Sequence, residues 1–336
     1  MSKKSSFSVS NNTEAIPNNK RLTYYLNNMS EQEVTLDLDK VVVKQPSLNR
    51  KKSHLITFAD FNRGFIFWYC KHIVHLWGIR KIRVLPWFKT YKTLHSLRDV
   101  LPTLKSLGMA YRDSGFLFYY GEHGTTPACP VIKKARRLDD KDSVLFKLGT
   151  MRHFAPCSKV DKHDLIWSKR KNAVVWRGAT TGKNQRVDFV KKYYHNFDIA
   201  FSSVKQKPGL SNFQKNKVSM KAQLTYKFIV SLEGNELASN LKWVLFSNSV
   251  PIMPSPTWCS WVMEDNLVPY KHYLPLNGDL DNLEELMKWA YKHDDECKQI
   301  ALNGRKYISQ FFDEKNELLI KKELLKEYTC RVTFNK

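Results

Sequence analysis

The stretch "VVWRGATTGKNQR", Val174 to Arg186, decides the fold. Its apolar run ends at a glycine-containing turn, which is the pattern of a buried strand. Residues 184–194 then follow a helical pattern. A strand, a turn and a helix in this order predict one unit of a parallel α/β sheet.

The turn resembles a Walker A phosphate loop but lacks two of its features. That loop reads GxxxxGK[ST], and its hydroxyl residue holds magnesium. Here three residues separate Gly178 from Gly182, and Asn184 occupies the hydroxyl position. We therefore do not expect a nucleoside triphosphatase.

A diphosphate is the ligand that this turn suits best. Amides at the start of the helix, together with Arg177, Lys183 and Arg186, can hold a diphosphate without a metal ion. An ordinary strand-to-helix turn on a basic surface fits the same residues, so the stretch by itself leaves both interpretations open.

Short apolar runs alternate with helical patterns along the chain beyond residue 105. The predicted strands are 115–120, 173–178, 197–204, 227–234 and 249–254. The predicted helices are 184–194, 235–247, 280–292 and 294–312. This alternation implies parallel sheets with crossover helices, and a length of 336 residues suggests two such units.

The chain is strongly basic, with 55 Lys and Arg against 32 Asp and Glu and a formal charge of +23. Anionic partners are therefore expected. A basic aromatic segment from Lys71 to Lys105 suits an anionic membrane surface. An amphipathic helix packed on its own domain fits it equally well. No nucleic-acid-binding motif accompanies the charge, so we expect no nucleic-acid partner.

Residues 1–50 are rich in Ser, Asn and Lys, which predicts a flexible polar tail. They contain no apolar core of a signal peptide, and no window of the chain approaches the roughly 20 apolar residues of a membrane span. We therefore expect a cytoplasmic protein. The six cysteines show no CxxC spacing, which argues against a zinc ribbon.

A second stretch, "YKFIVSLEGNELASNLKWV" from Tyr226, predicts a strand that ends near Glu233 and Gly234, followed by a helix. A carboxylate at the carboxyl end of a parallel strand lies where open sheets bind ligands, and it can accept hydrogen bonds from ribose or sugar hydroxyls. Alternatively, Glu233 is an acid at the N-terminus of the following helix, where the helix dipole favours negative charge.

These stretches resemble glycosyltransferase family 90. The resemblance rests on "WRGATTG" with Arg186, and on "YKFIVSLEGNELASNLKWVLFSNSVPIMP" followed by "PYKHYLPL". It covers about residues 115–313 and is best with the bacterial lipopolysaccharide core branch, which is related to fungal capsule xylosyltransferases and animal protein O-glucosyltransferases. It implies a GT-B fold, in which two Rossmann-like domains face a cleft, and inverting transfer from a UDP-sugar without an essential metal.

Individual residues match the family pattern. Arg177 and Gly178 match its "RG", Arg186 matches the arginine at the donor diphosphate, and Asn240 stands where eukaryotic relatives tend to have arginine. Residue patterns and resemblance together predict these donor-binding residues: Arg177, Gly178, Thr180, Thr181, Gly182, Lys183, Arg186, Lys227, Glu233, Gly234, Asn240 and Lys242.

The catalytic base is expected in "FLFYYGEHG", where the family places an aspartate after a strand of the N-terminal domain. Inverting displacement needs a base near the acceptor hydroxyl, opposite the leaving group. Glu122 and the neighbouring His123 are the two candidates. "MRHF" also resembles the family, which adds Arg152 and His153 as residues of the cleft.

The sequence thus predicts a tail (1–50), an acceptor-side domain (51–170), a nucleotide-sugar-binding domain (171–312) and a C-terminal helix and tail (313–336). The expected function is transfer of a hexose or pentose from a UDP-sugar to a hydroxyl of a lipopolysaccharide core or similar cell-surface glycan, at the cytoplasmic face of a membrane. The alternatives are a nucleic-acid-binding protein and a membrane-associated assembly protein without transferase activity.

Overall fold

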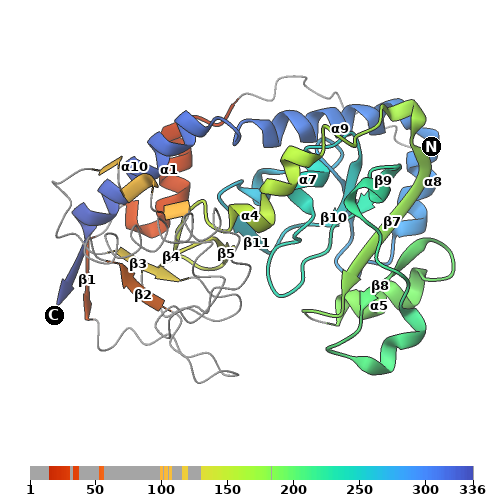
Figure 1. Ribbon diagram of the computed structural model, residues 1–336, viewed down its shortest axis with the longest axis horizontal. Coiled ribbons are helices and arrows are strands. Elements are labelled where there is room, and N and C mark those ends of the chain that lie inside the picture. Colours follow the sequence, from red (N-terminus) through yellow and green to blue (C-terminus); the bar gives the residue numbers. More distant parts are fainter. Residues whose placement is uncertain are drawn as a thin grey trace, which may run out of the picture.

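The computed structural model describes residues 15–30, 33–37, 53–56, 99–100, 102–104, 106–107, 116–119, 130–182 and 184–335. Helices and parallel strands alternate through the second half of the chain (Figure 1), which confirms the predicted α/β class. The predicted domain boundaries stay predictions.

Five parallel strands form the central sheet, in the order β12-β10-β9-β7-β8. Their bounds are β7 Lys171–Ala179, β8 Asp198–Ser203, β9 Tyr226–Val230, β10 Val250–Pro254 and β12 Leu274–Leu276. Four of them were predicted as apolar runs, and their middles are buried as expected for a sheet covered on both faces. The predicted strand at 115–120 is also confirmed, as β3 (Phe116–Tyr119) in another sheet.

The order of these strands reverses direction between β7 and β9. Along the chain, β8 is added on one side of β7, and β9, β10 and β12 are added on the other. In open α/β sheets the loops at such a reversal separate and leave a crevice beyond the carboxyl ends of the strands. The turns after Ala179 and Val230 lie at this position.

The helices of this region are α5 (Gln185–Tyr193), α7 (Leu241–Leu245), α8 (Leu283–Lys292) and α9 (Asp294–Ser309). In α8, Leu283, Leu286, Met287 and Ala290 recur at helical spacing and are all buried. The helix predicted at 235–247 begins only at Leu241. The residues between β9 and Leu241 form a loop. The side-chain amide of Asn240 holds this loop against β9 by donating to Val230 O at 2.9 Å.

The described N-terminal residues contribute a four-stranded sheet in the order β2-β3-β4-β6. Its strands are β2 (Ser53–Ile56), β3, β4 (Ile132–Lys133) and β6 (Val144–Leu145). A separate antiparallel pair joins β5 (Ala135–Arg137) to β11 (Trp258–Ser260). Residues near 136 and near 259 therefore lie side by side although more than 100 positions separate them.

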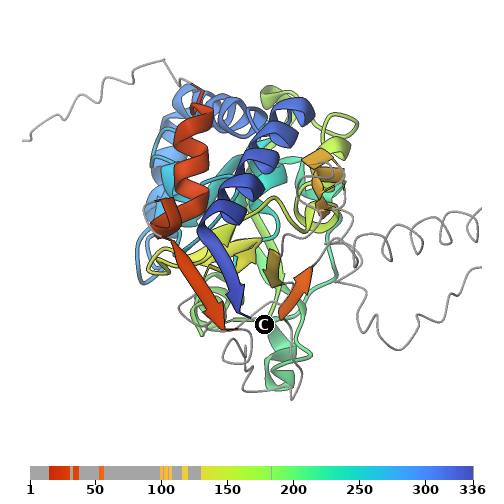
Figure 2. The ribbon, with the colours of Figure 1, turned by 90° about the vertical axis from the view of Figure 1, so that its left-hand side faces the viewer.

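The tail predicted over residues 1–50 is wrong for residues 15–30. Helix α1 (Asn18–Leu26) packs against α10 (Glu314–Arg331), and the two lie together in both views (Figures 1 and 2). Tyr25, Leu26 and Met29 are buried in the core. Composition failed here because the partners of this polar helix come from the other end of the chain. A short parallel pair, β1 (Val34–Asp37) with β13 (Val332–Asn335), continues the same contact.

Short elements connect these parts. They are the α-helices α4 (Thr150–His153) and α6 (Met220–Gln223), and 3-10 turns at Asn27–Ser30, Ala155–Lys159, Trp167–Lys169, Pro208–Phe213 and Glu264–Asn266. Within the ranges that the structure describes, no helix has the length and apolarity to cross a membrane.

Candidate functional site

Two glycine turns meet at the carboxyl edge of the central sheet. Gly182 follows β7 and has φ +85°, a conformation that L side chains rarely adopt. A Cβ built on Gly182 would lie 2.4 Å from the carbonyl oxygen of Gly234, in the turn after β9. Any side chain at 182 would therefore push the two turns apart. This contact explains the glycine at 182. A Cβ on Gly234 would instead lie 3.0 Å from Arg186 Nη2 and from Thr181 Oγ1.

Arg186, in the first turn of α5, joins these turns. Its guanidinium donates to Glu233 O at 2.9 Å and to Leu232 O at 2.5 Å, both after β9. It also donates to Ala179 O at 3.2 Å, at the end of β7, and to Thr181 Oγ1 at 2.9 Å, in the turn after it. The side chain thus bridges both strands at the point where their order reverses.

The charge of Arg186 has no anionic partner at ion-pair distance among the described residues. All four of its hydrogen-bond acceptors are neutral oxygens. Burial lowers the pKa of Arg186 to about 10, and the nearby charge of Glu233 offsets this only in part. The guanidinium therefore stays charged at neutral pH, and a bound anion would stabilise it.

Glu233 turns its carboxylate toward a different segment. It accepts hydrogen bonds from the backbone N–H of Thr257 at 2.9 Å and of Trp258 at 3.1 Å, and from the Thr257 hydroxyl. Burial raises the pKa of Glu233, although these hydrogen bonds oppose the shift. Glu233 thus connects the turn after β9 to the segment after β10.

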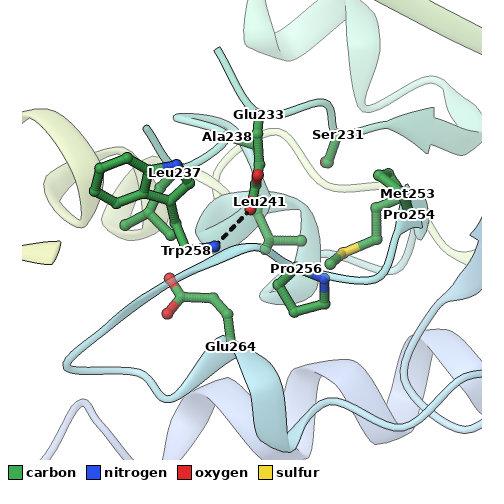
Figure 3. A pocket seen from close by; sticks show the side chains of 10 residues that line it. All are labelled: Ser231, Glu233, Leu237, Ala238, Leu241, Met253, Pro254, Pro256, Trp258 and Glu264. Atoms are coloured by element: carbon green, nitrogen blue, oxygen red, sulfur yellow. Dashed lines mark hydrogen bonds between the residues drawn. The ribbon is translucent and has the colours of Figure 1, made fainter. Parts of the chain in front are cut away.

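A pocket opens beside this carboxylate, between the turns after β9 and β10 (Figure 3). About 260 Å³ of space there is not filled by atoms, and part of it is open to solvent. Its walls are mostly apolar, and two carboxylates face it. The lining residues are Ser231, Glu233, Leu237, Ala238, Leu241, Met253, Pro254, Pro256, Trp258 and Glu264.

Glu264 is held rigidly at the pocket wall. It is buried and pairs with Lys242 Nζ at 2.9 Å. The backbone N–H of Ser260 donates to its other oxygen at 2.6 Å. Lys242 is thereby neutralised behind the pocket, so it does not offer the free charge toward a donor that the sequence suggested.

Most of the predicted donor residues gather at this edge. Thr181, Gly182, Gly234 and Glu233 contact or adjoin Arg186, and Asn240 fixes the loop that lines the pocket. Thr180 is buried, and its N–H donates to Ser203 O at the end of β8. A Cβ on Gly178 would lie 2.3 Å from the Trp176 ring, over which the Arg186 guanidinium sits. Gly178 therefore acts through packing.

Arg177 does not join the site, contrary to the prediction. Its guanidinium pairs with Asp198 Oδ1 at 2.5 Å and donates to Asp198 O at 2.8 Å. Asp198 begins β8, and its other carboxylate oxygen accepts from the hydroxyl of Tyr226, which begins β9. The Arg177 side chain therefore reaches back toward the amino edge of the sheet.

Lys227 is a second correction. It lies near the start of β9 and pairs with Asp294 Oδ1 at 2.5 Å, at the beginning of α9. It also lies 4.8 Å above the centre of the Trp167 ring. The contact is structural, because residues near the beginning and end of one strand belong to opposite edges of the sheet.

Three predicted residues, Lys183, Glu122 and His123, lie outside the described residues, as does most of the basic segment from Lys71 to Lys105. On α4, His153 is buried and Arg152 is exposed. No group of three His, Cys, Asp or Glu side chains in the described ranges is arranged to hold a metal ion.

Sequence reasoning missed Thr257, Trp258 and Glu264. Thr257 and Trp258 join the site through hydrogen bonds to Glu233, and Glu264 joins it through its ion pair with Lys242. These contacts span more than 20 positions, and no local pattern indicates them. The prolines at 254 and 256, one at the end of a predicted strand and one just beyond it, were the available signal for a turn at this edge.

Comparison with known proteins identifies the family to which this chain belongs. The model of Glycosyl transferase family 90 matches residues 150–336. The chain is 31% identical over 215 residues to "O-glucosyltransferase LpsA" of Dichelobacter nodosus, which covers 63% of this chain and 66% of that protein. It is 30% identical over 148 residues to "Protein O-glucosyltransferase 2" of Danio rerio, covering 42% and 29%.

A human relative, "Protein O-glucosyltransferase 3" of Homo sapiens, is 26% identical over 201 residues, which cover 54% of this chain and 38% of that protein. The chain thus spans less than two thirds of the length of each of these three proteins.

Proposed function

Because this chain belongs to glycosyl transferase family 90, we propose that it transfers a hexose or pentose from a UDP-sugar to a hydroxyl of a lipopolysaccharide core or similar cell-surface glycan. The observation that carries the proposal is the half-buried Arg186 guanidinium, whose hydrogen-bond partners within the described ranges are all neutral and which lies between two glycine turns at the carboxyl edge of the sheet. A diphosphate supplies the anion that such a site lacks.

The transfer is an inverting displacement. The acceptor oxygen forms a bond to the anomeric carbon as the bond from that carbon to the diphosphate oxygen breaks, and UDP leaves with the electron pair. Negative charge on the diphosphate is greater in the transition state than in the bound donor, so a preorganised cation accelerates the step. Arg186 and the turn amides fulfil this role without an essential metal, and the remainder of the donor occupies the adjoining pocket.

Glu122 takes the proton of the acceptor hydroxyl in this proposal, with His123 as the alternative base. Glu122→Gln is expected to abolish transfer while UDP affinity stays near the wild-type value, because the carboxamide cannot accept the proton. Single-turnover transfer assays and UDP calorimetry measure the two quantities. Transfer at the wild-type rate would exclude Glu122 and leave His123.

We also propose that the chain adopts the two-domain GT-B arrangement. Its support is the switch in strand order within the sheet of residues 171–276, which is characteristic of Rossmann-like domains, and the separate sheet formed by β2, β3, β4 and β6. The acceptor would then approach from the side of the second sheet.

The basic segment from Lys71 to Lys105 supports peripheral attachment to an anionic membrane at its cytoplasmic face. Binding to anionic vesicles that weakens as salt increases is the expected behaviour, since screening acts on exposed charges. Failure to bind such vesicles at low salt would remove the membrane role and leave the transferase role standing.

A screen of UDP-sugars against truncated lipopolysaccharides, with UDP release and product mass as readouts, tests the function directly. Release of UDP together with a product heavier by one hexose or pentose is expected. Failure of every donor, together with no UDP binding, would contradict the proposal and favour an assembly protein without transferase activity. Affinity for nucleic acid that is unchanged by Arg186→Ala would favour the nucleic-acid alternative.

A further inference from the structure

The turn Trp261–Met263 connects the two pocket residues Trp258 and Glu264. All three of its side chains are buried. Met263 has φ +52°, although it is not a glycine. A residue other than glycine in the left-handed region stores backbone strain, which persists only where surrounding contacts hold it. The contacts that hold this turn are therefore the ones that fix the pocket wall.

Two tyrosines from distant elements bind the carbonyls of this turn. Tyr25 of α1 donates its hydroxyl to Trp261 O at 2.5 Å. The Tyr307 hydroxyl of α9 lies 2.9 Å from Val262 O and 2.7 Å from Met263 O and shares its hydrogen between them. Met263 O also accepts from the backbone N–H of Asn266 at 2.9 Å. Among the described residues, the buried carbonyls of Trp261 and Val262, each costly to leave without a donor, thus depend on these two hydroxyl groups.

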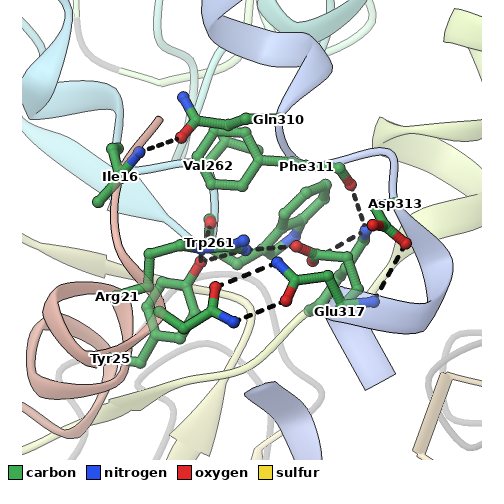
Figure 4. A network of polar contacts seen from close by, with 12 residues as sticks. Ile16, Arg21, Tyr25, Trp261, Val262, Gln310, Phe311, Asp313 and Glu317 are labelled. Atoms are coloured by element: carbon green, nitrogen blue, oxygen red, sulfur yellow. Dashed lines mark hydrogen bonds and ion pairs between the residues drawn. The ribbon is translucent and has the colours of Figure 1, made fainter. Parts of the chain in front are cut away.

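A buried ionic network orients the hydroxyl of Tyr25 (Figure 4). Arg21 Nη2 donates to Tyr25 Oη at 3.0 Å, so the tyrosine hydrogen is directed to Trp261 O. Arg21 pairs with Glu317 of α10 at 2.5 Å, and Glu317 also pairs with Lys147 at 3.0 Å. Helix α1 is thereby anchored to α10 at the place where it contacts the turn.

We propose that Tyr25 and Tyr307 are positioning residues for the pocket, and that helix α1 supports the donor site from outside it. The proposal rests on the proposed function, in which this pocket receives part of the UDP-sugar. The two hydroxyls hold the Trp261–Met263 turn, and the turn fixes Trp258 at one end and Glu264 at the other. Helix α1 lies outside residues 150–336, the part that matches the family.

The test compares three substitutions that each remove one buried tyrosine hydroxyl. Tyr25→Phe and Tyr307→Phe remove the contacts to the turn. Tyr328→Phe is the matched control, because the Tyr328 hydroxyl donates to Pro130 O at 2.8 Å in the same buried core and does not contact the turn. UDP affinity is measured by calorimetry well below the unfolding midpoint of each variant, and the midpoints are recorded alongside.

Tyr25→Phe and Tyr307→Phe are expected to weaken UDP binding by about fivefold, the factor that one neutral hydrogen bond is worth. Tyr328→Phe should lower the unfolding midpoint similarly and keep the wild-type Kd. In turnover with whichever donor the wild type accepts, the two turn variants should raise the KM for the donor and leave kcat and the KM for the acceptor unchanged.

Wild-type UDP affinity in both turn variants, despite lowered unfolding midpoints, would overturn the positioning role and leave the proposed function intact. A UDP affinity lowered equally in Tyr328→Phe would also overturn it, since any loss of core stability would then give the same result. Absence of UDP binding by the wild type would overturn the proposed function and this inference together.

Discussion

Cationic side chains at the two edges of the central sheet differ in their hydrogen-bond and ion-pair partners. At the amino edge, Arg177 and Lys227 are each paired with a carboxylate at 2.5 Å. At the carboxyl edge, Lys242 is also paired, with Glu264 at 2.9 Å, but the acceptors of Arg186 among the described residues are all neutral oxygens. A paired cation contributes to the fold and offers little to a ligand, whereas a cation without an anion is ready to bind one. This difference supports the proposal that the anion site lies at the carboxyl edge.

Arg186→Ala should have the largest effect on activity. Loss of one preorganised donor at the developing charge is expected to cost about 2 to 4 kcal/mol of transition-state stabilisation. Steady-state transfer assays at saturating acceptor measure the fall in kcat/KM. Arg177→Met serves as the control, and it should retain near-normal transfer. Full activity in Arg186→Ala would remove this residue from the mechanism.

Gly182→Ala should separate the two turns of the carboxyl edge. A Cβ would contact Gly234 O, and the φ of +85° disfavours alanine, so we expect a loss of about 1 to 3 kcal/mol in unfolding free energy together with weaker UDP binding. Gly278→Ala is the matched control, because no atom lies within 4 Å of its built Cβ. Equal stability and UDP affinity in the two variants would contradict the close approach of the turns.

Arg177→Met should affect the opposite edge and reduce stability alone. It leaves the Asp198 carboxylate without its cation, but about a third of the Asp198 side chain is exposed, so the expected loss is about 1 kcal/mol. Chemical denaturation measures this loss, and UDP calorimetry should give the wild-type Kd. A Kd raised as far as in Arg186→Ala would return Arg177 to the donor site.

The smallest effect expected is on stability: the contributions of Asp198 and Glu233 to the unfolding free energy should depend on pH in opposite ways. Burial tends to raise the pKa of Asp198, but hydrogen bonds from Arg177 and Tyr226 and the charge of Arg177 lower it overall. Its contribution to stability is therefore complete above the usual pKa of about 3.9 and is lost as the pH falls through the lower folded value.

Glu233 should behave in the opposite way. Its pKa is raised by burial, so its contribution is complete below the usual value of about 4.3 and is lost as the pH rises through the folded value. The unfolding free energies of Asp198→Asn and Glu233→Gln are measured between pH 3 and 6, and each is subtracted from the wild-type value. The two differences should change with pH with opposite slopes, each by about 1 kcal/mol or less over this range. Slopes of the same sign would contradict the assigned environments.

The sheet and its helices were predictable because their signals are local. The strands β7 to β10 are continuous apolar runs, and α8 and α9 follow from helical spacing of buried residues. Helix α1 was missed because Asn18–Leu26 is polar in composition, and its burial depends on Glu317, almost 300 residues away.

The site was predictable where its residues are neighbours in the sequence. Gly182 and Arg186 lie in one stretch, so the sequence joined them correctly. Arg177 lies in the same stretch but reaches back along the strand to Asp198, a direction that a sequence pattern does not contain. Glu264 is held at the pocket wall by Lys242, 22 positions away, and by the backbone N–H of Ser260, contacts that a sequence pattern does not contain.

UDP binding to the wild type, Arg186→Ala and Arg177→Met, compared by calorimetry in one buffer, tests the central claim most directly. Arg186→Ala is expected to weaken UDP binding by at least about tenfold, as loss of a charge-assisted hydrogen bond implies, while Arg177→Met should bind UDP as the wild type does. Equal weakening in both variants, or no weakening in Arg186→Ala, would contradict the assignment of the anion site to the carboxyl edge of the sheet.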